Sequence, residues 1–337
     1  MQNHQDRLRT AVVAALAVLT SLVVVSPASA AKPGVIGCGS TITSSVTLAA
    51  DIGPCVRGGL VIGADDVTLD LGGHRVFGKS RTGDGIGIAV PGHTGVTIRN
   101  GTVAQFDAGV VIDGGSGNLV EAITANFNQG GARGDFGDGI LISDSSGNTV
   151  QSNNVTNNGP FSGISLLGVT EDNEILSNVV ASNGVPATGN DGIRVEGPGA
   201  AGNLVQGNTV TGSTLDGIAV FRGVAVPGGP SLNNENRIIA NTVTANGFGH
   251  LGARPGDGIR VFPGPMDTVI QSNSVRDNAG NGIIVANGST SNDILTNTAI
   301  GNARAAALFD LNDGHQTCDA NVWSGNTFET ANQSCIS

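Results

Sequence analysis

Aromatic residues and lysine are scarce in this chain of 337 residues. It has no Tyr, a single Trp and 3% aromatic residues in total, and its only lysines are Lys32 and Lys79. Clefts that bind sugars commonly use aromatic side chains as platforms, so this scarcity argues against a cleft of that kind. The formal net charge of −11 disfavours nucleic acid and anionic membranes as partners, because both are negatively charged themselves.

Apolar residues with a helical period of about 3.6 are absent after the leader. The one long apolar run spans 11–25, follows a short basic start and precedes Ala28-Ser29-Ala30. A membrane-spanning helix needs about 20 apolar residues, so this run is too short. The pattern predicts a secretory signal peptide at 1–30 that is removed after Ala30. We therefore expect a secreted protein, extracellular or in the cell envelope, with no membrane segment once the signal is removed.

A short motif recurs through the rest of the chain: a small or acidic residue, Gly, an aliphatic residue, any residue and a second aliphatic residue. Successive copies are 24 or 25 residues apart, with longer gaps of 29, 30 and 41 where residues are inserted. A fixed period of this length is typical of solenoid proteins. The Gly residues of the copies are Gly85, Gly109, Gly139, Gly163, Gly192, Gly217, Gly258 and Gly282.

A second motif lies between these copies and reads Asn, any residue, an aliphatic residue, two residues, Asn, as at Asn148 and Asn153. Apolar and polar residues alternate in the intervening segments, as at Ile193, Arg194 and Val195, which predicts short strands. If successive periods stack, equivalent Asn side chains lie about 4.8 Å apart and can form an internal hydrogen-bonded ladder. Asn also tolerates the left-handed backbone that we expect at the corners.

These patterns predict an all-β parallel β-helix, a solenoid of about ten coils counted from Leu60. Stacked coils share one continuous core that no single coil provides. A leucine-rich repeat needs many Leu residues and a helical return, and a calcium β-roll repeats about every nine residues, so neither fits. We expect an N-terminal cap at 31–59, the β-helix at 60–309, and the last coil with a C-terminal cap at 310–337.

Each end of the chain carries two cysteines separated by 17 residues: Cys38 and Cys55, and Cys318 and Cys335. An exported chain meets an oxidising compartment, so disulfides are expected. A long rod keeps its ends apart, which favours the bonds Cys38–Cys55 and Cys318–Cys335 over either crossed pairing. We expect the protein to be a monomer.

The coils resemble those of the pectin-lyase-like superfamily of right-handed parallel β-helices. The stretch from Val67 to His74 is similar to the first coil of many secreted bacterial members, and the resemblance covers about residues 60 to 328. It implies a right-handed solenoid of the single-stranded type. The superfamily contains pectate and pectin lyases, polygalacturonases, alginate epimerases and members without known catalysis, so the resemblance makes polysaccharide the expected partner.

Four insertions flank the Gly-Ile strands. Three precede such a strand, at 129–137, 185–190 and 247–256, and one follows a strand, at 222–235. Insertions on one face of a solenoid often build its binding face, so these loops could wall a groove beside coils four to eight.

The candidate site residues are those that would face this groove. The candidates for catalysis are Arg194, Arg260, His250, Asp191 and Asp257. The candidates for substrate binding are Arg133, Arg222, Arg254, Asp138 and Asp216. Two carboxylates could hydrolyse a glycosidic bond, or Asp side chains could hold Ca²⁺ against a uronate while Arg or His removes a proton. The recurrence of Asp before Gly equally fits a turn residue that caps its own backbone amides, and an outward Arg equally fits a solvated surface charge.

Family motifs leave the activity open. The G-H-G, N-T-D and R-I-K motifs of polygalacturonases are absent, and a chain without Tyr cannot carry the Tyr-containing motif of alginate epimerases. The first hypothesis is a protein that binds or acts on extracellular polysaccharide, as a lyase or glycoside hydrolase if it is an enzyme. The second is a non-catalytic extracellular scaffold or binding module. A third, an accessory protein for copper-site assembly, is disfavoured because two Met and scattered His give no soft metal cluster.

Overall fold

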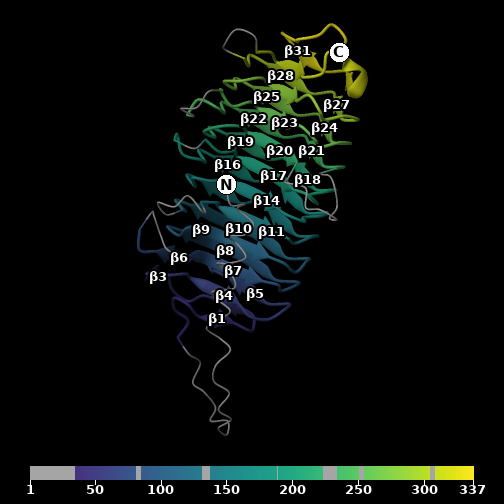
Figure 1. Cartoon of the computed structure of the whole chain (residues 1–337). Helices are drawn as coiled ribbons and strands as arrows, with labels where there is room; N and C mark the ends of the chain where they lie inside the picture. The colour runs from purple at the N-terminus through teal and green to yellow at the C-terminus, as the bar shows by residue number, and fades with distance from the viewer. Residues whose placement is uncertain are drawn as a thin grey trace.

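The computed structural model describes residues 35–80, 85–130, 137–187, 189–222, 234–249, 254–303 and 308–337. Within these ranges the chain is all β apart from one 3₁₀ turn, η1 (Cys318–Ala320), which confirms the predicted fold class. The coils stack along a rod, with the first coils at one end and the last at the other (Figure 1). The signal peptide predicted at 1–30 lies outside the described residues.

In the described part of the chain, no helix has the length and apolar character that crossing a membrane requires.

Sheet A takes one strand from each coil, and all its neighbours are parallel. From β4 onward it has ten strands within the described residues, in agreement with the ten coils expected from Leu60. Its strands, in spatial order, are β1 (Thr41–Ile42), β4 (Leu60–Ile62), β7 (Ile86–Pro91), β9 (Ala108–Asp113), β11 (Ile140–Ser143), β14 (Ile164–Leu167), β17 (Ile193–Gly197), β20 (Ile218–Arg222), β23 (Ile259–Val261), β26 (Ile283–Val285) and β29 (Leu311–Asp313).

Sheet B forms the rest of each coil in two rows, which the long strands β8 (Thr97–Ala104) and β10 (Leu119–Asn126) join. The first row also contains β2 (Val46–Thr47), β5 (Thr68–Asp70), β12 (Thr149–Gln151), β15 (Glu174–Leu176), β18 (Leu204–Gln206), β21 (Arg237–Ile239), β24 (Val269–Gln271), β27 (Asp293–Leu295) and β30 (Val322–Ser324). The second row also contains β3 (Ile52–Cys55), β6 (Arg75–Gly78), β13 (Asn154–Thr156), β16 (Val179–Ala181), β19 (Thr209–Thr211), β22 (Thr242–Thr244), β25 (Ser274–Arg276), β28 (Thr298–Ile300) and β31 (Thr327–Phe328).

The register between coils places like residues on top of one another. Ile193 pairs with Ile218, and Arg194 pairs with Ala219, which in turn pairs with Arg260. The inward aliphatic residues form one continuous core whose members are almost completely buried. The alternation seen in the sequence therefore separates core from surface as predicted, and Arg194 and Arg260 share one outward column.

The Gly of the recurring motif is required by the closeness of the next coil. A Cβ built on Gly192 would lie 2.3 Å from Cγ1 of Val210 and 2.7 Å from the carbonyl oxygen of Gly217. No side chain fits in that space. Gly at this position lets the corner before each sheet A strand pack against the second row of sheet B and against the following coil.

Asn ladders run through the buried corners, as the sequence predicts. Oδ1 of Asn178 accepts hydrogen bonds from the backbone N and Nδ2 of Asn153, both at 3.0 Å. Nδ2 of Asn178 donates to Oδ1 of Asn208 at 3.0 Å and to the carbonyl oxygen of Val150 at 2.9 Å. The ladder of Asn178 continues along the rod through Asn208, Asn241, Asn273, Asn297 and Asn326.

The left-handed backbone at these corners belongs to the residue before each ladder Asn. Ser152 and Ser177 have φ angles of 55° and 53°, whereas Asn153 and Asn178 are not left-handed. The expectation that the ladder Asn itself takes this conformation is wrong. Its side chain must point into the coil to reach the next Asn, so the tight corner falls to the residue before it.

Both predicted disulfides are present at the ends of the described solenoid. Cys38–Cys55 and Cys318–Cys335 have Cα–Cα distances of 5.5 and 6.0 Å. Within the segment expected as the N-terminal cap, β1, β2 and β3 pair with β4, β5 and β6. The solenoid therefore has a coil before Leu60.

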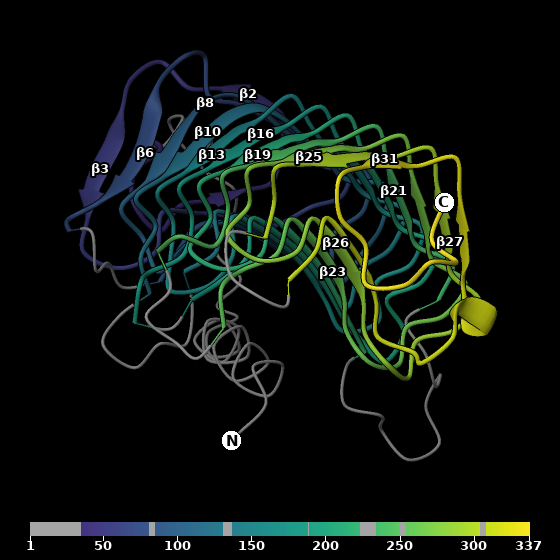
Figure 2. The ribbon, with the colours of Figure 1, turned by 90° about the horizontal axis from the view of Figure 1, so that it is seen from above.

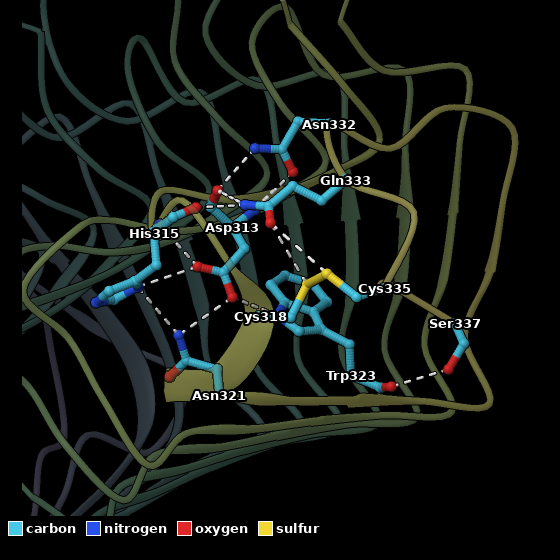
Figure 3. The surroundings of a disulfide bond; sticks show 9 residues. All are labelled: Asp313, His315, Cys318, Asn321, Trp323, Asn332, Gln333, Cys335 and Ser337. Atoms are coloured by element: carbon cyan, nitrogen blue, oxygen red, sulfur yellow. Dashed lines mark hydrogen bonds and ion pairs between the residues drawn. A yellow bond between two sulfur atoms is a disulfide. The ribbon is translucent and has the colours of Figure 1, made fainter.

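A buried carboxylate organises the C-terminal end, beside Cys318–Cys335 (Figure 3). Oδ2 of Asp313 accepts a hydrogen bond from Nε1 of Trp323 at 2.7 Å, and Oδ1 lies 3.1 Å from Nδ1 of His315. Nε2 of His315 accepts a hydrogen bond from the backbone N of Gly288 at 3.3 Å. Trp323 is 5% exposed, so it packs into the core of the last coil.

We predict that Asn178→Ala lowers the free energy of unfolding by about 2–5 kcal/mol, because buried backbone groups in two coils lose their partners. Denaturant unfolding followed by circular dichroism measures this change. Asn154→Ala is the matched control, since Asn154 is an exposed Asn and should change the stability little. Equal effects of the two substitutions would contradict a stabilising role for the ladder.

Candidate functional site

The outward positions of sheet A change character along the rod. In the first coils they are apolar, as at Val61, Ala89 and Val111, which pair in register. From β17 onward they carry Arg194 and Arg260. In the view down the rod, β23 and β26 lie on the concave side of the bent coil (Figure 2). The charged half of this face contains most of the predicted site residues.

Arg194 projects from β17 between two carboxylates. Its Nη1 lies 3.2 Å from Oδ2 of Asp191, and its Nε donates to Oε2 of Glu196 at 2.7 Å. Its side chain is only 19% exposed. Arg194 is therefore a paired, largely buried cation and not a solvated surface charge.

Arg254 and Arg260 bind the next two carboxylates along the rod. Arg254, on the insertion before β23, holds Asp216 through two hydrogen bonds, of 2.9 Å from Nη1 and 2.8 Å from Nη2. Oδ2 of Asp257 lies 3.3 Å from Nη1 of Arg254 and 2.6 Å from Nη1 of Arg260. These ion pairs form two groups, which the hydrogen bond from the backbone N of Asp216 to Oδ1 of Asp191 joins. We refer to the seven residues as the arginine–aspartate cluster: Asp191, Arg194, Glu196, Asp216, Arg254, Asp257 and Arg260.

The same aspartates also tie successive coils together. Oδ1 of Asp191 accepts from the backbone N of Asp216 at 3.1 Å, and Oδ1 of Asp216 accepts from the backbone N of Asp257 at 2.7 Å. Oδ1 of Asp257 accepts from the backbone N of Asn281 at 2.6 Å. These three aspartates bind the backbone of the following coil, so the expected capping of their own turn is replaced by a link between coils.

Two Phe residues that the sequence analysis missed lie under the arginines. The rings of Phe221 and Phe262 stack with centroids 3.8 Å apart and an interplanar angle of 17°. The guanidinium of Arg194 lies 3.9 Å from the Phe221 centroid, and that of Arg260 lies 4.7 Å from the Phe262 centroid. The signal was present in the sequence, since Asp-Gly-Ile-x-Val-Phe occurs twice in consecutive coils.

Burial changes the acidity of the cluster. The side chains of Asp191 and Asp216 are 0% exposed and that of Asp257 is 2% exposed. Burial, followed by the charge of Asp216, raises the pKa of Asp191 to about 7. The same two causes raise the pKa of Asp257. Burial alone would lower the pKa of Arg194, but Asp191 and Glu196 outweigh it and raise that pKa.

The remaining predicted residues either form no ion pair with the cluster within the described part of the chain or lie outside the described residues. Asp138, at the corner before β11, accepts a hydrogen bond from Oγ of Ser165, and burial raises its pKa to about 6. Arg222 is exposed at the end of β20 and lies against Gly264. Arg133 and His250 fall outside the described residues. Phe248, which the sequence analysis also missed, lies on the same insertion as Arg254 and is 53% exposed.

The cluster does not fit a Ca²⁺ site. In the ranges that the structure describes, no group of three or more His, Cys, Asp or Glu side chains is placed to hold a metal ion. Ca²⁺ is bound by about six to eight oxygen ligands that all point at the ion. The oxygens of Asp216 and Asp257 are instead directed at guanidinium and backbone N–H groups.

A cavity of about 460 Å³ opens at the other end of sheet A and does not overlap the cluster. Apolar residues of β4 and β7, among them Leu60, Val61 and Ala89, form much of its lining. Arg57 and Asp107 are its charged residues. The groove expected beside coils four to eight is therefore not this cavity.

The fold and repeat pattern match a known family. A family model described as the right-handed β-helix region matches residues 62–225, 137–303 and 188–337, which together cover most of the chain. The chain belongs to the right-handed β-helix family. No curated protein matches this right-handed β-helix protein significantly.

Solved structures with the same fold include enzymes whose names refer to alginate and pectate. The Dettilon tailspike protein is 19% identical with a TM-score of 0.62, over 86% of this chain and 59% of the tailspike. A double mutant of the periplasmic alginate epimerase AlgG is 13% identical with a TM-score of 0.55, over 81% of this chain and 70% of the epimerase. Pectate lyase Pel9A is 13% identical with a TM-score of 0.52, over 89% of this chain and 78% of the lyase. These likenesses show the fold.

We predict that the melting temperature of this β-helix protein falls by several degrees between pH 5 and pH 8. Each unit by which folding shifts a pKa changes the free energy of unfolding by about 1.4 kcal/mol. The folded pKa values of Asp138 and Asp191, about 6 and about 7, lie above the ordinary value of 3.8. Their stabilising contribution is complete below the unfolded pKa and is lost as the pH rises through the folded one. Calorimetry across this range measures it.

Asp191→Asn should make the melting temperature depend less on pH, because the carboxyl group that titrates near neutrality is removed. The Asn side chain keeps an oxygen that can accept the hydrogen bond from the backbone N of Asp216. Glu174→Gln is the control, since Glu174 is an exposed carboxylate on sheet B. The lowered pKa values of Asp65 and Asp70 act only below about pH 4, outside the range tested. A melting temperature that rises with pH would contradict the assigned protonation.

Proposed function

We propose that this right-handed β-helix protein is exported and binds an extracellular polysaccharide along the outer face of sheet A. One observation carries the proposal: guanidinium groups from β17, from β23 and from the insertion before β23 converge over two stacked Phe rings on a partly exposed surface. Arg and carboxylate groups side by side supply the donors and acceptors that sugar hydroxyls need. Two disulfides agree with an oxidising compartment outside the cytoplasm.

Binding is favoured over cleavage by the positions of the carboxylates. A general acid or base must come within hydrogen-bond reach of the bond it attacks. Asp191, Asp216 and Asp257 are almost fully buried, and each already accepts a backbone hydrogen bond from the following coil. The carboxylate of the cluster that reaches the surface is Glu196, which is 33% exposed.

Phe248 supplies a second aromatic side chain for the proposed site. It lies on the insertion that also carries Arg254, close to the end of the second row of sheet B, and about half of it is exposed. An aromatic ring in this position can stack on the apolar face of a sugar ring. Phe248 would then supply stacking, while Arg260 and Glu196 would supply hydrogen bonds.

We predict that Phe248→Ala weakens binding to the polysaccharide that the protein retains by roughly tenfold, about 1.4 kcal/mol. Affinity gel electrophoresis through a panel of soluble polysaccharides identifies the ligand and measures the change. The matched control is Val322→Ala on sheet B, because Val322 is exposed to a similar extent, 52% against 53%. Absence of retardation by every polymer would overturn the proposed function.

Cleavage is a second candidate, favoured by one observation. With its pKa raised to about 7, Asp191 is about half protonated at neutral pH, as a general acid requires, and its buried side chain would have to be uncovered to reach a substrate. If the protein cleaves its ligand, incubation with the polymer panel should release reducing ends or produce the ultraviolet absorbance of unsaturated uronates. Asp191→Asn should abolish the product while polysaccharide binding persists. Product from that variant at the wild-type rate would contradict the role of Asp191.

A further inference from the structure

The positive charges of the cluster are already satisfied within the protein. Arg194 lies within 3.2 Å of Asp191 and within 2.7 Å of Glu196. Arg254 holds Asp216 at 2.8 Å, and Arg260 holds Asp257 at 2.6 Å. Guanidinium groups recognise carboxylates strongly when they present their paired N–H groups to them. Here those groups point at aspartates that the next coil fixes in place, so a carboxylate on a ligand would have to compete with them.

The charge of this face does not favour an anionic ligand either. The cluster has four carboxyl groups and three guanidinium groups, and Asp191, with a pKa of about 7, is only partly ionised at neutral pH, so the charges of the cluster come close to balance. Arg222 at the end of β20 adds one positive charge, so the described residues of this face carry no large excess of positive charge. The whole chain carries a formal net charge of −11, so its long-range field repels polyanions.

The Phe rings under the arginines also favour a ligand with hydroxyl groups over an anionic one. One guanidinium of the cluster lies over Phe221, and two lie within 5.5 Å of the Phe262 centroid. These contacts hold the guanidinium planes in fixed positions. Within the described residues, the carboxylates take Nε and Nη1 of Arg194 and Nη1 of Arg260, so Nη2 of each guanidinium remains as a donor held in a fixed position. Such donors, together with the carboxylate of Glu196, match a hydroxyl group, which both donates and accepts.

We infer that the ligand of this site is a neutral polysaccharide, recognised through its hydroxyl groups, rather than a polymer of uronic acids. The inference rests on the proposed function, because it names the class of polysaccharide for the same site. It separates this protein from relatives of the same fold whose names refer to alginate and pectate.

Titration calorimetry with neutral polymers (dextran, arabinoxylan and galactomannan) and acidic ones (polygalacturonate and alginate) tests the inference. We expect at least one neutral polymer to bind, with a Kd that changes less than about twofold between about 20 and about 500 mM NaCl. Binding of an acidic polymer alone, weakened by salt, would overturn the inference and leave the proposed function standing. Binding of none of the polymers would overturn both.

Glu196→Gln provides a local test, with Glu174→Gln as the control of equal charge change on sheet B. The substitution replaces the charged acceptor of Nε of Arg194 with a neutral amide and removes one acceptor oxygen from the surface, so the affinity for the neutral polymer should fall at least threefold, roughly 0.7 kcal/mol. Glu174→Gln should leave that affinity unchanged. Equal changes in the two variants would show that only the overall charge matters, which contradicts recognition at this site.

Discussion

The hydrogen bond from the backbone N of Asn153 to the side-chain oxygen of Asn178 shows how the register of this solenoid is fixed. Side chains alternate along a strand, so a slip of one residue would turn every inward residue outward. The ladder prevents such a slip at a corner of each coil, where the strand pairing itself ends. The outer face of sheet A inherits that register. Arg194, Ala219 and Arg260 form one column because the ladders hold their coils in step.

At the corner before each sheet A strand, side chains of consecutive coils also stack, but here several of them are carboxylates instead of Asn amides. Carboxylates stacked in consecutive coils stand about 4.8 Å apart, and their mutual repulsion is strong when they are buried. Asp191, Asp216 and Asp257 are in this position, and each is accompanied by a guanidinium from the outward column or from the insertion before β23. Charge buried at a repeating corner therefore needs a cation beside it, and the arginine–aspartate cluster supplies one at each of these three corners.

The sequence was sufficient for everything that follows from the period. It predicted the solenoid and the shared register of Arg194 and Arg260, because both depend on residues equivalent by repetition. It also predicted both disulfides, because a stacked rod keeps its two ends apart. It did not predict that Arg254 would bind Asp216, because the path of an insertion is not set by the period. It also missed the stack of Phe221 on Phe262, although their equal offsets from the recurring Gly placed them in one column. A low aromatic content says nothing about where the few aromatic residues lie.

Two corners before sheet A strands show that consecutive coils can stack without a carboxylate at this position. Asn281 occupies the position of Asp257 in the next coil, and its Oδ1 accepts the backbone N of Phe309 at 2.9 Å. Ser162 occupies the position between Asp138 and Asp191, and the coils there remain paired through the backbone. A neutral oxygen, or none, satisfies the corner. The turn therefore explains the acceptor at Asp191, Asp216 and Asp257 but not the negative charge, and that charge serves the arginines on the outer face of sheet A.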